Sequence, residues 1–84
     1  MKLQQRTILV TGGAGGIGLE LARQLLARGN TVIVTGRDAG RIEEARRRLP
    51  GLHGIVSDVA DPASIEALHR EVTATFPALD VLVN

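Results

Sequence analysis

Short runs of Val, Ile, Leu and Thr alternate with helix-like stretches along the whole sequence, and this alternation limits the available folds more than any other feature. The runs predicted to be strands are Thr7–Thr11, Thr31–Thr35, Gly54–Ser57 and Leu79–Val83. They are nearly continuous in apolar residues, which is typical of parallel strands covered on both faces. No low-complexity linker interrupts the alternation, so we predict a single domain over residues 1–84.

Three helices are predicted between these strands. The apolar residues that recur at helical spacing are Ile17, Leu21, Ala22, Leu25 and Leu26, then Ile42, Ala45 and Leu49, then Ile65, Leu68 and Val72. Gly29 follows the last turn of the first helix as a stop signal. The second helix is expected over Ala39–Leu49 with Asp38 as its N-cap, and the third from the N-cap Asp61 to Phe76.

Repeated strand–helix–strand units predict a parallel sheet, because the crossovers in such units are right-handed. The expected fold class is therefore α/β, a Rossmann-like parallel sheet of strand order 3-2-1-4 with helices on both faces. This arrangement is an incomplete half of a doubly wound fold. Two helices would cover one face, only one would cover the other, and the fourth strand would have no neighbour beyond it. We expect the uncovered face or edge to favour self-association, for example as a dimer.

The charge balance argues against two classes of partner. Ten Lys and Arg against nine Asp and Glu give a net charge of +1, so neither a nucleic acid nor an anionic membrane is expected to bind. The run Arg46–Arg48 spreads around a helix axis and is expected on a solvated surface. The chain has no Cys, no signal-peptide pattern and no apolar stretch of membrane-spanning length, so we predict a soluble protein of the cytoplasm.

The two histidines are expected to bind no metal. His53 begins the third strand and His69 lies in the third helix, and neither has ligand residues at metal-binding spacing. We expect His69 to lie opposite the face that carries Ile65 and Val72. Both histidines are therefore interpreted as surface or boundary residues and not as catalytic bases.

Five of the chain's ten glycines lie between Gly12 and Gly18, where the first strand is followed by the first helix. Glycine permits a positive φ, lets a ligand approach the backbone and allows a helix to pack closely on a sheet. The start of a helix also offers free N–H groups to an anion. No Lys follows the last glycine, which excludes the phosphate loop of phosphoryl-transfer enzymes. The pattern predicts a site for a dinucleotide pyrophosphate, with plain turn glycines as the alternative.

The end of the second strand bears on which dinucleotide binds. A carboxylate there would bind the ribose 2′-hydroxyl of NAD, whereas Arg37 can pair with the 2′-phosphate of NADP. Asp38 is acidic and adjacent, but its position before a helix is better explained as an N-cap. NADP is therefore favoured over NAD, with a solvated surface arginine as the alternative. Asp58, after the third strand, is expected either to accept a hydrogen bond from the adenine amine or to cap a turn.

The stretch Thr11–Gly18 matches the pattern Thr-Gly-x-x-x-Gly-x-Gly, and here the chain resembles the classical branch of the short-chain dehydrogenase/reductase family. It also matches Thr-Gly-x-x-Gly-x-x-Gly, a pattern of the extended branch. Gly16 stands where the extended branch usually has a bulky apolar residue. Leu79–Asn84 is similar to the fourth strand that leads into the family's Asn-Asn-Ala-Gly motif. Both features favour the classical branch, and the resemblance covers only the N-terminal third to half of such enzymes.

The resemblance implies a set of cofactor-binding residues: Gly12, Gly15, Gly16, Ile17, Gly18, Arg37, Asp58, Val59 and Asn84. The glycines at 12, 16 and 18 would shape the turn, which Thr11 would help to hold. The backbone at Gly15 and Ile17 would lie near the cofactor phosphates. Arg37 would then meet the 2′-phosphate.

The remaining implied contacts lie on the adenosine side, where Asp58 and Val59 would touch adenine and Asn84 would lie near the ribose. The family's catalytic Ser, its Tyr-x-x-x-Lys pair and its later Asn have no counterpart here, and the chain contains no Tyr. No catalytic residue is therefore assigned. The resemblance implies a non-catalytic, NADP-binding fragment of an oxidoreductase that transfers hydride between nicotinamide and a carbonyl or alcohol. The alternative is a stand-alone nucleotide-binding or self-associating module without activity.

Overall fold

A computed structural model describes residues 5–83 of the chain. Over this range it has four strands: β1 (Thr7–Thr11), β2 (Thr31–Gly36), β3 (His53–Val56) and β4 (Leu79–Val83). Its three helices are α1 (Gly16–Ala27), α2 (Ala39–Arg48) and α3 (Pro62–Thr75). The predicted α/β class is confirmed. The bounds of β1 and β4 match the prediction, those of β2 and α2 differ by one residue at one end, and β3 is shifted by one residue at both ends.

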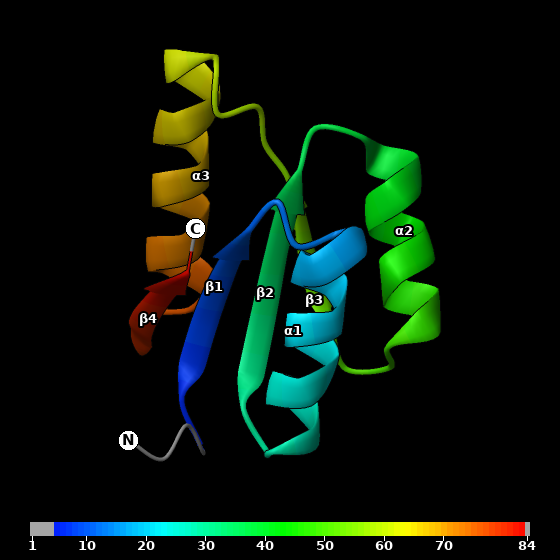
Figure 1. Cartoon of the computed structure of the whole chain (residues 1–84). Coiled ribbons are helices and arrows are strands. Elements are labelled where there is room, and N and C mark those ends of the chain that lie inside the picture. The colour runs from blue at the N-terminus through cyan, green and yellow to red at the C-terminus, as the bar shows by residue number, and fades with distance from the viewer. Residues whose placement is uncertain (1–4, 84) are drawn as a thin grey trace.

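The four strands are parallel and lie in the predicted order, β3-β2-β1-β4. β1 pairs with β2 up to Thr11 opposite Thr35, and β3 places Ile55 opposite Thr35 on the other side. The carboxyl ends of these three strands therefore meet at the same edge of the sheet, at the top of Figure 1. The connections to α1, α2 and α3 all leave from this edge, which is where parallel α/β sheets bind their ligands.

The helices cover the two faces of the sheet unequally (Figure 1). The larger core cluster lies between the sheet and α1 and α2, and its buried residues are Ile8, Val10, Ala22, Leu25, Val32, Val34, Ile42, Ala45 and Leu52. The cluster on the α3 face has four buried residues: Leu9, Ile33, Ile55 and Val72. Since buried apolar area drives folding, the α1/α2 face contributes most of the packing free energy.

Aspartates start two of the helices, as predicted. The carboxylate of Asp38 accepts hydrogen bonds from the backbone N–H groups of Gly40 and Arg41, at 2.8 and 3.3 Å. The carboxylate of Asp61 accepts one from the N–H of Ala63 at 3.1 Å. Each bond satisfies an amide that the first helical turn leaves without an intrahelical partner.

Two expectations about helix faces need revision. Ile17 has the spacing of the α1 core residues, but it is 90% exposed and lies outside both core clusters, in the first turn at the carboxyl edge of the sheet. The expectation that His69 lies opposite Ile65 and Val72 is wrong. Residues four apart share a helix face, and His69 lines the same groove as Ile65 and Val72.

That groove, here called the α3 groove, separates α3 from the neighbouring edge of the sheet. It has a volume of about 550 Å³, and its apolar lining includes Leu9, Ile65, Leu68, Val72, Phe76 and Leu82. Leu82 on the edge strand β4 is 59% exposed and Ile65 on α3 is 46% exposed. The less covered face is therefore the α3 face, on the side of β4.

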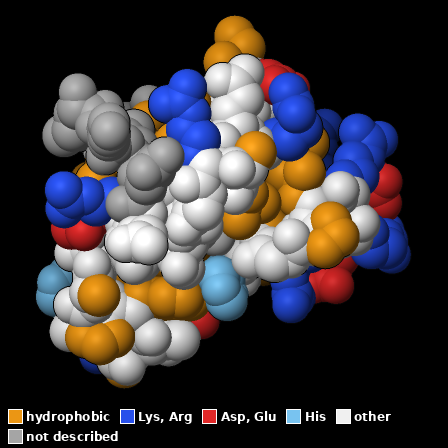
Figure 2. All heavy atoms as spheres, turned by 90° about the horizontal axis from the view of Figure 1, so that it is seen from below, with side chains coloured by type: hydrophobic (Ala, Val, Ile, Leu, Met, Phe, Trp, Pro, Cys, Tyr) orange, Lys and Arg blue, Asp and Glu red, His pale blue; other side chains and the backbone are white. Residues whose placement is uncertain are grey.

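Each arginine of the basic run Arg46–Arg48 has an ion-pair partner on its own helix. The three guanidinium groups lie 2.7–3.2 Å from the carboxylates of Glu43 and Glu44, one turn earlier in α2. Figure 2 shows basic and acidic side chains interspersed along this side of the molecule. The prediction of a solvated face is confirmed. In residues 5–83, no helix has the length and apolar character needed to cross a membrane.

Candidate functional site

The turn between β1 and α1 presents bare backbone on its outer side. Gly12 and Gly16 have φ angles of +69° and +59°, which residues with a side chain rarely adopt. Gly15 is extended, with a φ of −158°. A Cβ atom added to any of the three would meet no atom within 4 Å. A ligand can therefore approach this backbone closely.

Gly13 and Gly18 lie on the inner side of the turn, where there is no room for a side chain. A Cβ on Gly18 would be 2.9 Å from the Cα of Gly13 and 3.0 Å from the carbonyl oxygen of Gly12. A Cβ on Gly13 would be 2.6 Å from the Cγ1 of Val34 in β2. α1 thus begins in direct backbone contact with the turn, which fixes where its first amides point.

α1 begins without a side-chain cap, unlike α2 and α3. Its N-cap is Gly15, which offers no side-chain oxygen, and its first turn contains no acidic residue. The amides at the start of α1 therefore carry unsatisfied hydrogen-bond donors at the positive end of the helix dipole. This is the arrangement that binds phosphate groups at helix N-termini.

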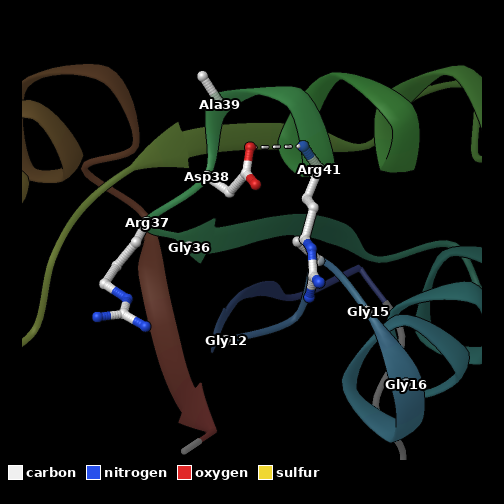
Figure 3. A pocket seen from close by; sticks show the side chains of 9 residues that line it. Gly12, Gly15, Gly16, Gly36, Arg37, Asp38, Ala39 and Arg41 are labelled. Carbon is white, nitrogen blue, oxygen red and sulfur yellow. Dashed lines mark hydrogen bonds between the residues drawn. The ribbon is translucent and has the colours of Figure 1, made fainter.

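The glycine turn borders a pocket of about 890 Å³, here called the turn pocket, which also reaches the β2–α2 connection (Figure 3). Its lining residues are Gly12, Ala14, Gly15, Gly16, Gly36, Arg37, Asp38, Ala39 and Arg41. Within residues 5–83, neither Arg37 nor Arg41 forms an ion pair. Asp38 is the one acid in the lining, and its carboxylate is hydrogen-bonded to the amides of α2. The pocket therefore attracts anions.

A second hollow, of about 310 Å³, adjoins the turn pocket and shares Gly12, Gly36 and Arg37 with it. Val59 lines this hollow and is 64% exposed. Asp58 lines neither space, and its carboxylate accepts a hydrogen bond from the N–H of Ala60 at 2.9 Å. The structure thus shows the turn-capping alternative for Asp58, while its contact with adenine stays a prediction.

Ser64 ties the β3–α3 connection in place, which the sequence analysis did not foresee. Its hydroxyl accepts a hydrogen bond from the N–H of Asp58 at 2.8 Å and lies 3.3 Å from the hydroxyl of Ser57. These contacts link the first turn of α3 to the end of β3. They hold Val59 beside the second hollow, at the carboxyl edge of the sheet.

The structure brings together part of the predicted site. The predicted residues that line the turn pocket are Gly12, Gly15, Gly16 and Arg37, and Val59 lines the adjoining hollow. Those that line neither space are Ile17, Gly18 and Asp58. The predicted residue Asn84 lies outside the described residues. The hydroxyl of Thr11 donates to the carbonyl oxygen of Val83 at 3.3 Å, so it links β1 to β4. Over residues 5–83, no group of three or more acidic or histidine residues could hold a metal ion.

Comparisons with known proteins agree with the geometry of the turn pocket. The family model for short chain dehydrogenases matches residues 6–84. The chain belongs to the short-chain dehydrogenase family. Among solved structures, menthone neomenthol reductase from Mentha piperita superposes with a TM-score of 0.89 at 43% identity, over 95% of this chain and 31% of that chain.

Curated relatives in the family are similar over all or nearly all of this chain. The uncharacterized oxidoreductase DltE of Bacillus subtilis (strain 168) is 49% identical over 84 residues, which are 100% of this chain and 33% of that protein. The (+)-neomenthol dehydrogenase of Arabidopsis thaliana is 42% identical over 87 residues, covering 94% of this chain and 29% of that protein. The chain thus spans about a third of the length of these short-chain dehydrogenases.

Short-chain dehydrogenases bind nicotinamide dinucleotide cofactors, and the residues of the turn pocket fit such a group. The open backbone at Gly12, Gly15 and Gly16 leaves room for a pyrophosphate next to the uncapped start of α1. Arg37 and Arg41 add positive charge on the opposite wall of the pocket. The predicted family and fold are confirmed by these comparisons.

Proposed function

We propose that this chain is the NADP-binding N-terminal part of a short-chain oxidoreductase that transfers hydride between nicotinamide and a carbonyl or alcohol substrate. The main support is that the uncapped start of α1 and Arg37 line the same pocket. Relatives that match this chain include a galactitol 2-dehydrogenase and a putative ketoacyl reductase of a polyketide synthase. Both names are those of oxidoreductases, as the proposal requires.

In this proposal the chain binds and orients the cofactor. The amides at the start of α1, including that of Ile17, donate hydrogen bonds to the pyrophosphate, and Arg37 pairs with the 2′-phosphate. Val59 and Asp58 contact adenine, and Asn84 lies near the adenosine ribose. When bound, the nicotinamide ring supplies or accepts the hydride. The proposal assigns this chain no catalytic residue, in keeping with a sequence that contains no Tyr.

A titration of the ¹⁵N-labelled chain with NADPH and with NADH, followed by NMR, tests the proposal. We expect saturable shifts of the amides of residues 12–18 with both cofactors, and tighter binding of NADPH. Shifts spread over the surface, or none at millimolar NADPH, would contradict the dinucleotide site. Equal affinities for the two cofactors would contradict the preference for NADP alone.

A second candidate function is a self-associating module, and the α3 groove favours it. The groove is apolar, and Leu82 beside it is exposed on β4, the last strand of the sheet in the described chain. Unpaired strand edges and exposed apolar patches promote association. We propose that two copies of the 84-residue chain pair across this side, and a monomer at high concentration in sedimentation would reject this. The predicted cytoplasmic location also remains a proposal, which cell fractionation tests.

A further inference from the structure

Arg41 occupies the turn pocket although no sequence pattern pointed to it. It lies in the first turn of α2, four residues after Arg37, and its own N–H bonds to the carboxylate of Asp38. In Figure 3 its side chain runs from α2 toward the turn that carries Gly12 and Gly15. Arg37 runs down on the other side of Gly12 in the same view. Both side chains line one pocket, so they approach the same space from two directions.

The charge environment separates this pair from most other arginines of the chain. Arg6, Arg23 and the run Arg46–Arg48 each have a carboxylate partner within 4 Å. Within residues 5–83, Arg37 and Arg41 have none, although they lie in a pocket that contains Asp38. The hydrogen bonds of Asp38 to Gly40 and Arg41 turn its Oδ1 oxygen toward the amides of α2. Two arginines from different elements thus line one pocket without a carboxylate partner in residues 5–83.

A phosphomonoester is the ligand that such a pair suits. It carries close to two negative charges near neutral pH and several acceptor oxygens, whereas each guanidinium offers one positive charge and a planar set of donors. Binding by both arginines would balance the two negative charges of the ligand. A ribose 2′-hydroxyl carries no charge and gains nothing from a second arginine.

We propose that Arg41 is a second specificity-determining residue, which binds the 2′-phosphate of the dinucleotide together with Arg37. This inference rests on the proposed function. It extends that function by making the preference for a 2′-phosphorylated nucleotide depend on two residues from different elements, the end of β2 and the first turn of α2. Replacing either one alone should leave a partial preference.

The test uses two small probes that differ only in the group of interest, adenosine 2′,5′-bisphosphate and AMP. NMR titrations of the 84-residue chain give the ratio of their dissociation constants. We expect Arg41→Ala to weaken the bisphosphate about ten-fold and to leave AMP unchanged, as loss of a charge-assisted hydrogen bond predicts. Arg41→Lys keeps the charge but loses the planar donors, so its affinity for the bisphosphate should lie between those of Arg41→Ala and the parent chain. The double variant of Arg37 and Arg41 should bind both probes equally.

Arg70→Ala is the matched control, because Arg70 is also without an ion pair within residues 5–83 but lies on α3, outside the turn pocket. It should leave the ratio unchanged. If Arg37→Ala lowers the preference for the bisphosphate over AMP and Arg41→Ala does not, the role of Arg41 is overturned and the proposed function stands. Equal weakening of both probes by Arg41→Ala would also overturn it. A parent chain that binds both probes equally would instead contradict the NADP preference itself.

Discussion

Gly18 shows how a single missing side chain fixes the start of α1. A Cβ there would press on the backbone of Gly12 and Gly13 at 2.9–3.0 Å, and backbone cannot move aside as a flexible side chain can. We expect Gly18→Ala to lower the free energy of unfolding by about 1–3 kcal/mol, the usual range for overpacking. Urea denaturation followed by circular dichroism measures the change.

Gly15→Ala is the control for this experiment. Gly15 is extended and a Cβ on it would meet no atom within 4 Å, so Gly15→Ala should lose only the N-cap preference for glycine over alanine and should destabilise the fold less than Gly18→Ala. If Gly18→Ala were as stable as the parent chain, the close contact between α1 and the turn would be refuted.

Glu20 and Arg23 form an exposed ion pair on α1 whose strength a titration can measure. The hydrogen bond from Arg23, followed by that from Gln24, lowers the pKa of Glu20 from 4.5 to about 2. Because this pKa is lowered in the folded state, the pair stabilises the fold above pH 4.5, and that stabilisation is lost as the pH falls toward 2. Arg23→Ala should return the pKa of Glu20 toward its ordinary value, as NMR titration of its carboxyl carbon would report. Added salt should raise it as well, since the pair is exposed.

Individual site residues were predictable from the sequence only where local pattern decides their place. Gly12, Gly15 and Gly16 belong to a strand–turn–helix pattern that is local, and they line the turn pocket, while their contact with a cofactor stays a prediction. Arg41 was missed because it comes to share a pocket with the glycine turn only after β1 and β2 pair. Gly13 was missed for the same reason, since its close contact is with Val34 in the neighbouring strand.

Among the helices, α1 is the one whose start is left open, and its cap position can be changed. The backbone at Gly15 is extended, as it is at the N-caps Asp38 and Asp61. An aspartate at Gly15 should therefore cap α1 and raise the free energy of unfolding by a few tenths of a kcal/mol, roughly the difference between Gly and Asp at an N-cap. Its carboxylate would accept hydrogen bonds from the first amides of α1 and would repel an anion.

We therefore expect Gly15→Asp to gain stability and to lose dinucleotide binding, measured by denaturation and by NMR titration with NADPH. Gly15→Asn supplies a similar cap without the negative charge, and it should weaken binding less. Undiminished affinity in Gly15→Asp would show that the start of α1 does not contact the phosphates.

The order of helices and strands could be read from the sequence because their boundaries are set by neighbouring residues. Asp38 and Asp61 cap the helices that follow them, and Gly29, with a φ of +87°, follows the last turn of α1. The face that a helix residue occupies was less predictable at helix ends. Ile17 keeps the helical spacing but lies in the first turn of α1, beyond the packed part of the sheet.

For the molecule as a whole, the exposed apolar side chains differ between the two edges of the sheet. Leu82 on β4 is 59% exposed beside the α3 groove, whereas Val56 on β3 is 53% exposed and lies away from it. If two copies pair across the α3 groove, Leu82→Glu should shift the chain toward monomer by at least ten-fold in dissociation constant, about 1.4 kcal/mol. Sedimentation equilibrium over a concentration series measures this shift.

Val56→Glu adds the same charge at the opposite edge and should leave the association unchanged. Equal effects of the two substitutions would indicate general repulsion between charged chains and not a specific interface.

The bond between Thr11 and Val83 joins residues 72 positions apart. β1 lies between β2 and β4 in the sheet, yet β4 follows it along the chain only after β2 and β3. During synthesis β1 can pair with β2 soon after both emerge, but one side of it stays without hydrogen bonds until β4 follows. The nascent chain thus exposes a strand edge with unpaired hydrogen-bonding groups for a time. Chaperones that shield exposed backbone would bind it in that interval.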